Sequence, residues 1–125
     1  MAIVGIGTDL ARIERFRKFV QSESKVIERI FSEGERDYAL QMKDPAPHLA
    51  ARFAAKEAFV KALGTGLRDG LSWQHVVVVR DALGCPSLQL SGRAAEMLNE
   101  RAVRSTHLSY SHDGDYAVAT VILES

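Results

Sequence analysis

Several features that define other protein classes are absent from this chain of 125 residues. Its only cysteine is Cys85, which excludes an internal disulfide and any metal site built from several cysteines. No apolar run approaches the ~20 residues that a membrane-spanning helix needs. The first ten residues, MAIVGIGTDL, lack the basic start of a secretory signal peptide. We therefore expect a cytoplasmic protein with no membrane partner.

A net charge is also absent, because 16 basic residues balance 16 acidic ones. This balance gives no reason to expect a nucleic-acid partner. The chain is 46% hydrophobic and 26% charged, which is an ordinary globular composition. Its length is typical of one domain, and no segment is rich enough in Pro, Gly or Ser to act as a linker. We expect residues 1–125 to form a single domain.

Hydrophobic periodicity predicts an α+β fold, in which a mainly antiparallel sheet packs against a long central helix and shorter helices. Strands are expected over residues 3–8, 75–80, 87–90, 107–112 and 116–123. A first helix is expected from about residue 11, and helical character is expected to continue over 22–30. A new helix is expected to begin near Ser32 and to end at about residue 41. Two further helices are expected over 48–63 and over 91–101.

Local signals predict where these elements begin and end. Ser32 and Glu35 have the spacing of a capping box, which opens a helix. The DPAP segment, residues 44–47, is expected to form a loop before the long helix. Gly64 is expected to cap that helix at its C-terminus. Asp113-Gly114 is expected to be the turn of a hairpin, so that His112 would face Asp115.

The first predicted strand has glycines at positions 5 and 7. Glycine inside a strand usually marks a bulge or the close approach of another backbone. Asp9 is expected to lie where this strand ends.

Charged residues interrupt the apolar face of the helix expected over 48–63. One stripe at 3.6 residues per turn contains Leu49, Phe53, Val60 and Leu63. Lys56 lies inside this stripe, Glu57 lies on its edge, and Lys61 follows one turn after Glu57. Ionised side chains are almost never fully buried unless they are paired or bound to a metal. This stretch is therefore the first candidate for a functional site.

Asp9 and Glu57 form a candidate metal site. Mg²⁺ is commonly held by one or two carboxylates together with substrate phosphates and water. The alternative is structural: Asp9 would cap the next helix and Glu57 would form a surface ion pair with Lys61. The spacing alone favours the structural alternative, whereas the position of Glu57 beside Phe53 and Val60 favours the metal site.

Lys56, Lys61, Gly64 and Gly66 form a candidate phosphate site. Lysine binds phosphate as a point charge, and glycine lets a backbone approach an anion closely. Helix capping explains the glycines equally well.

His112 could contact a phosphate or a base, or could simply be an exposed hairpin residue. Arg12 and Arg15 are expected to project from the helix after Asp9. They form either a solvated face or a docking surface for an acidic partner.

These residues resemble the signatures of the 4′-phosphopantetheinyl transferases, in particular the small bacterial holo-[acyl-carrier-protein] synthase family. The family's short G-I-D-like segment is matched by GIGTD at residues 5–9. Its (F/W)-x-x-K-E-(A/S)-x-x-K motif is matched by FAAKEAFVK at residues 53–61. Further similarity lies in FSEGE at 31–35, ALGTG at 62–66 and LSYSH at 108–112. The match covers essentially the whole chain.

The resemblance implies transfer of 4′-phosphopantetheine from coenzyme A to a serine of apo acyl carrier protein, with release of 3′,5′-ADP. Asp9 and Glu57 would ligate Mg²⁺, and Lys61 would hold a phosphate and neutralise the leaving group. Lys56 would support the same cluster. His112 would lie near the coenzyme A nucleotide. Either Glu57 or a metal-bound water would serve as the general base.

Partners follow from the same resemblance. Arg12 and Arg15 would face the acidic recognition helix of the carrier protein. The protein would be a homotrimer with active sites between neighbouring subunits. Two other functions stay open at this point: a non-enzymatic nucleotide- or coenzyme A-binding module, which has no need of Asp9, and an interaction domain that uses only the basic face.

Overall fold

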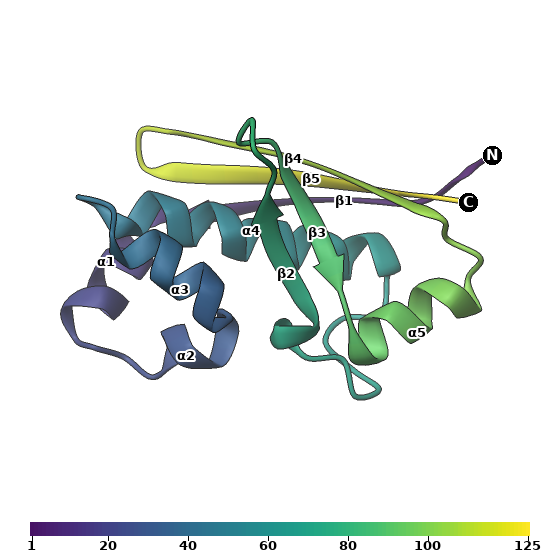
Figure 1. Cartoon of the computed structure of the whole chain (residues 1–125), viewed down its shortest axis with the longest axis horizontal. Coiled ribbons are helices and arrows are strands. Elements are labelled where there is room, and N and C mark those ends of the chain that lie inside the picture. The colour runs from purple at the N-terminus through teal and green to yellow at the C-terminus, as the bar shows by residue number, and fades with distance from the viewer.

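Helix α4 (Pro45–Leu63) lies at the centre of the molecule, between two antiparallel sheets (Figure 1). The computed structural model describes all 125 residues. The larger sheet contains, in spatial order, β1 (Ile3–Arg12), β5 (Tyr116–Glu124) and β4 (Ser105–Asp113). The smaller sheet is a hairpin of β2 (Val76–Arg80) and β3 (Pro86–Leu90). The predicted α+β architecture around a long central helix is confirmed.

The remaining helices are short (Figure 1). They are α1 (Ile13–Gln21), α2 (Val26–Ile30), α3 (Glu33–Leu40), the 3₁₀ turn η1 (Trp73–His75) and α5 (Gly92–Glu100). No helix combines the length and the apolar character that crossing a membrane requires.

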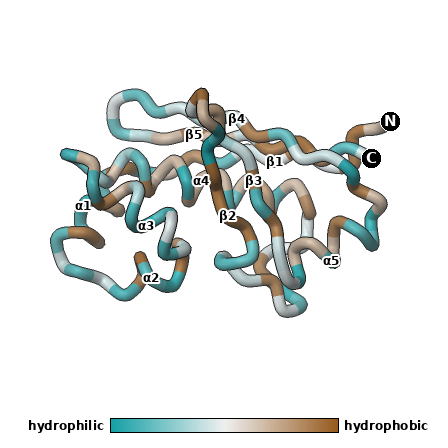
Figure 2. Tube along the Cα trace, in the orientation of Figure 1, coloured by the Kyte–Doolittle hydropathy of each residue, from teal (hydrophilic) through white to brown (hydrophobic).

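Helix α4 is buried on nearly all sides, not along one stripe as predicted. Phe59 is fully buried although it lies outside the predicted stripe, and so are the alanines at 50, 54, 55 and 58. The sheet covers one side of α4, while α1, α3 and the β2–β3 hairpin cover the others. The small alanine side chains let these neighbours approach closely. Figure 2 shows that β2, one of those neighbours, consists largely of hydrophobic residues.

Strand β1 is longer than predicted. It was expected to end near Thr8 but continues to Arg12, because the whole strand pairs with β5, from Ile3 opposite Glu124 to Arg12 opposite Tyr116. Asp9 is therefore an internal strand residue, and Arg12 ends the strand instead of lying on the helix. A long-range strand partner overrides the local helical pattern here.

Three other boundaries differ from the prediction. The DPAP segment is not a loop: α4 begins at Pro45, because proline suits the first helical turn, where no N–H partner is required. The helical character predicted over 22–30 is confirmed only for α2, because a turn with Glu23 at φ 51° separates this helix from α1. The hairpin turn is Gly114-Asp115, so that Asp113 pairs with Tyr116 and His112 with Ala117.

Two local signals are confirmed. The capping box is present, because the Ser32 hydroxyl accepts a bond from the Glu35 amide and the Glu35 carboxylate accepts one from the Ser32 amide. Gly64 caps α4 in the left-handed conformation, with φ 78°.

Candidate active site

The glycines of β1 bring this strand into direct contact with α4. A Cβ atom at Gly7 would lie 2.0 Å from the Ala58 carbonyl oxygen, and one at Gly5 would lie 2.1 Å from that of Ala62. Real side chains cannot occupy such positions, so only glycine permits this packing. The predicted close approach is confirmed, and a bulge is also present between residues 3 and 5. This contact brings Asp9 to the side of α4 that carries Lys61.

Asp9 and Lys61 form an ion pair at the surface of this contact. The Lys61 Nζ lies 2.9 Å from the Asp9 Oδ1 and also donates to the Thr8 carbonyl at 3.2 Å. The Lys61 side chain is 53% exposed, whereas that of Asp9 is 14% exposed. The hydrogen bond to Asp9 raises the pKa of Lys61, so the ammonium stays charged at neutral pH.

Glu57 lies half-buried beside this pair. Burial raises the pKa of its carboxyl group, and the nearby charge of Asp9 raises it further, while Lys61 and Arg15 act in the opposite direction. Lys61 binds Asp9 and not Glu57, so the ion pair within the helix that the structural alternative required is absent. The structure thus brings together Asp9, Glu57 and Lys61, although Asp9 and Lys61 are separated by 52 positions in the sequence.

Two carboxylates without a third partner restrict the kind of metal that would fit. No group of three or more His, Cys, Asp or Glu side chains is arranged to hold an ion. This pair suits Mg²⁺, which usually keeps water and takes its other ligands from substrate phosphates. It does not suit a structural zinc ion, which needs four protein ligands.

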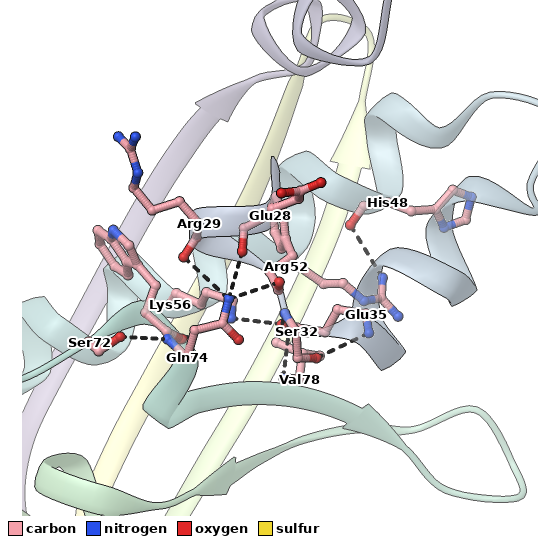
Figure 3. Close-up of polar contacts among 12 residues, drawn as sticks. Glu28, Arg29, Ser32, Glu35, His48, Arg52, Lys56, Ser72, Gln74 and Val78 are labelled. Carbon is pink, nitrogen blue, oxygen red and sulfur yellow. Dashed lines mark hydrogen bonds and ion pairs between the residues drawn. The ribbon is translucent and has the colours of Figure 1, made fainter. Parts of the chain in front are cut away.

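Lys56 lies inside the core and has internal partners (Figure 3). Its Nζ lies 2.8 Å from the Glu35 Oε1 and donates to the Trp73 carbonyl at 3.0 Å. Both side chains of this pair are 0% exposed. Burial lowers the pKa of Lys56, and the charge of Glu35 opposes this shift. The ammonium is therefore not free to support a phosphate cluster together with Lys61.

The glycine turn after α4 has two different members. Gly64 donates its amide to the Val60 and Lys61 carbonyls, so this amide is used within the protein. Gly66 also has a positive φ, 70°, and its amide makes no hydrogen bond with the chain. Helix capping therefore explains Gly64, whereas Gly66 keeps a free donor.

His112 lies on the same face of the large sheet as Asp9. It pairs with Ala117, which in turn pairs with Ala11 two positions along β1 from Asp9. His112 is exposed and lines a pocket of about 300 Å³. The pocket also contains Arg17 and Asp44, whose side chains form an ion pair at 2.8 Å.

Arg12 and Arg15 are both exposed next to this region. Arg12 donates to the Tyr116 hydroxyl at 3.0 Å, and Arg15 lies over the Phe53 ring at 5.7 Å. Because the charge of Arg15 lowers the pKa of Glu57, the basic surface adjoins the carboxylates.

The burial of two polar residues, Glu35 and Arg52, was not predicted from the sequence. Glu35 was interpreted only as a capping residue, although a lysine on an apolar stripe demands a carboxylate partner. Arg52 is only 2% exposed and has no carboxylate partner; its guanidinium lies 4.4 Å from the Tyr38 ring centroid. It lines a pocket of about 530 Å³ that also contains Arg80.

A family model for the 4′-phosphopantetheinyl transferase superfamily matches residues 5–121. The chain belongs to this superfamily. It is 55% identical, over 96% of its length and 94% of the relative's, to a holo-[acyl-carrier-protein] synthase of Syntrophotalea carbinolica.

Solved structures of this superfamily have the same fold. The crystal structure of holo-[acyl-carrier-protein] synthase from Neisseria meningitidis matches with a TM-score of 0.87 and 36% identity, covering 99% of this chain and 100% of that one. A holo-[acyl-carrier-protein] synthase from Bacillus anthracis, in complex with CoA (3′,5′-ADP), matches with a TM-score of 0.81 and 39% identity, covering 98% and 97%.

Proposed function

We propose that this protein transfers 4′-phosphopantetheine from coenzyme A to a serine of apo acyl carrier protein, as a holo-[acyl-carrier-protein] synthase. The observation that carries the proposal is the cluster of Asp9, Glu57 and Lys61 in a member of this transferase superfamily. In the reaction the serine hydroxyl oxygen attacks a phosphorus atom of the pyrophosphate. The P–O bond to 3′,5′-ADP breaks, and the serine proton passes to a base.

Asp9 and Glu57 are the residues that would hold Mg²⁺. When bound, the ion would neutralise negative charge on the pyrophosphate as the P–O bond breaks. The pKa of Glu57 is raised mainly by burial and further by the charge of Asp9, and a cation shared by the two carboxylates would offset both effects. The serine proton would pass either to an oxygen of Glu57 or to a water held by the ion.

Lys61 would bind a phosphate and stabilise the leaving group. Its ammonium is charged and half-exposed, so it can turn from Asp9 to a substrate phosphate when a cation takes its place beside that carboxylate. Gly66, with a free amide, would provide a further donor. Phosphoryl transfer depends mainly on such positioning and charge stabilisation.

Arg12 and Arg15 would receive the acidic helix of the carrier protein. Both are exposed, and Arg15 lies near Glu57, so a carrier bound there would present its serine to the site. Arg17 is less available, because it is paired with Glu14 and Asp44. Electrostatic complementarity of this kind accelerates encounter.

A homotrimer would cover the outer face of the large sheet. This face carries Ile6 and Leu10 of β1, which are 62% and 60% exposed, and no helix packs against it. Exposed apolar patches of this kind commonly mark an interface, and closed symmetry would bury it in each subunit. Sedimentation should give three times the 13.8 kDa chain mass. A monomer at micromolar concentration would contradict this assembly. A cytoplasmic location stays a prediction of the sequence.

The test of the reaction is a mass-shift assay with coenzyme A, Mg²⁺ and apo acyl carrier protein. The carrier should gain the mass of phosphopantetheine, and omission of Mg²⁺ should abolish the gain. The Glu57→Gln protein should be folded and inactive, while Glu96→Gln, an exposed change on α5, should be fully active. Coenzyme A binding without any mass gain would instead identify a binding module.

A further inference from the structure

The buried Glu35–Lys56 pair connects four parts of the chain (Figure 3). The Glu35 Oε1 accepts bonds from the Lys56 ammonium at 2.8 Å and from the Ser32 amide at 2.9 Å. The Glu35 Oε2 accepts a bond from the Val78 amide of β2 at 3.0 Å. Lys56 also donates to the Trp73 carbonyl in η1. Helices α3 and α4, strand β2 and turn η1 are therefore joined at one point, without contact with solvent.

This pair ties the rotation of α4 about its axis to α3, β2 and η1. Consecutive helical residues project about 100° apart, so inward anchoring of Lys56 determines the direction of Glu57. With Lys56 held by Glu35, Glu57 points to the flank where the charges of Asp9 and Arg15 act on it. An apolar side chain at position 56 would fill the same volume but would impose no such direction.

The same pair anchors the far end of the loop over residues 64–72. The loop follows α4 at Gly64 and ends where η1 begins at Trp73, whose carbonyl binds Lys56. The next residue, Gln74, donates its side-chain amide to three carbonyls at the end of α2, those of Glu28, Arg29 and Phe31, at 2.9–3.3 Å. The loop carrying Gly66 therefore lies between two anchored ends.

We propose that Lys56 is a positioning residue: through Glu35 and the Trp73 carbonyl it orients Glu57 and holds the 64–72 loop beside the transferase site. The inference rests on the proposed function for the role of Glu57, but its effect on the loop is independent of that function. A residue that only stabilised the fold would affect neither the loop nor the site once the protein was folded.

The experiment compares Lys56→Met with wild type and with Leu123→Ala. Leu123 is 0% exposed in β5, which packs against β1, β4 and α4, so its truncation should also destabilise the fold without touching the pair. Below the melting temperature of all three proteins, hydrogen exchange by mass spectrometry should be at least tenfold faster over residues 64–75 in Lys56→Met alone. Mn²⁺ binding in the presence of coenzyme A, followed by electron paramagnetic resonance, should weaken tenfold or more, as is typical when a residue supporting a metal ligand is lost.

The outcomes separate the inference from the proposed function. Exchange and Mn²⁺ affinity within twofold of wild type in folded Lys56→Met would overturn the positioning role. A wild-type protein that binds no Mn²⁺ in the presence of coenzyme A would overturn the proposed function and the claim on Glu57. Faster exchange of the loop would still support its anchoring. If Lys56→Met does not fold, the double variant Glu35→Gln/Lys56→Met, which leaves no unpaired buried charge and makes no bond to the Trp73 carbonyl, is judged by the same criteria.

Discussion

Two lysines of α4 make ion pairs of nearly the same length in opposite surroundings. Lys56 lies 2.8 Å from Glu35, and both side chains are 0% exposed. Lys61 lies 2.9 Å from Asp9, with the lysine 53% exposed. Distance therefore does not distinguish these pairs. Burial does, because an interior pair has no water or ligand to replace a lost partner, whereas a surface lysine can exchange one anion for another.

The comparison assigns different roles to residues within one short motif. The buried pair joins elements of the fold and has no access to a substrate. The surface pair is open to solvent, and in the proposed reaction it would separate when a phosphate and a cation enter.

Removal of the buried charge should have the largest effect on stability. Lys56→Met leaves the Glu35 carboxylate buried without its cation, and we expect the free energy of unfolding to fall by about 3–5 kcal/mol. Denaturant unfolding measures this loss. The double variant Glu35→Gln/Lys56→Met, which carries neither charge, should lose less than the single variant. If the single and double variants lost the same free energy of unfolding, Lys56 would not stabilise the fold through its ion pair with Glu35.

Removal of the surface charge should give the opposite result. Lys61→Met should change the free energy of unfolding by less than about 1 kcal/mol, because solvent screens the exposed pair. Its kcat/KM for the transfer should fall about 100-fold, since a charge that stabilises the transition state is lost. Denaturant unfolding and steady-state kinetics on one preparation provide both values. If Lys61→Met lost as much stability as Lys56→Met, the surface and buried ion pairs would not differ in their contribution to the fold.

The basic surface beside the site should affect the carrier protein only. Arg15→Glu should lower kcat/KM for the carrier about tenfold at low salt, by replacing attraction with repulsion, and the difference should shrink as salt screens it. Arg104→Glu, next to the C-terminal end of β5, is the matched control. If both changes had the same effect, net charge would explain the result and no docking surface would be needed.

The smallest effect is a gain in stability from Glu57→Gln at neutral pH. The folded state raises the pKa of Glu57, so between its ordinary and its raised value the unfolded state binds fewer protons. The wild type therefore loses stability as the pH rises through this window, and the glutamine variant does not. The melting temperature of the variant should exceed that of wild type at pH 7.5, with a difference that shrinks as the pH falls towards 4.5. A lower melting temperature for the variant at pH 7.5 would contradict the raised pKa.

The sequence predicted most of the fold and the central residues of the candidate site. Alternation in the last two strands, the capping box at Ser32 and the cap at Gly64 depend on neighbours within a few residues. Asp9 and Glu57 were found because their types and motif spacing are unusual, and the structure brings them together as expected. The predictions were wrong where contacts between distant segments determine the local structure. One example is the extension of β1, which is caused by its pairing with β5.

Lys56 shows this limit most clearly. Its position on a buried face required a charged partner, but the partner lies 21 residues earlier, in a helix whose packing local sequence does not reveal. The hairpin register is a second case. Either Asp113-Gly114 or Gly114-Asp115 could form a two-residue turn, and the pairing of β4 with β5 selects the second.

The sequence by itself determined the types and order of the elements, the residues able to bind a metal or a phosphate, and the glycines that permit close packing on α4. These properties follow from backbone preferences and side-chain chemistry, which act locally. Only the tertiary structure decided which lysine is buried and which can meet a substrate, because burial depends on segments far apart in the chain. Lys56 and Lys61 have the same chemistry, and their surroundings alone give them different roles.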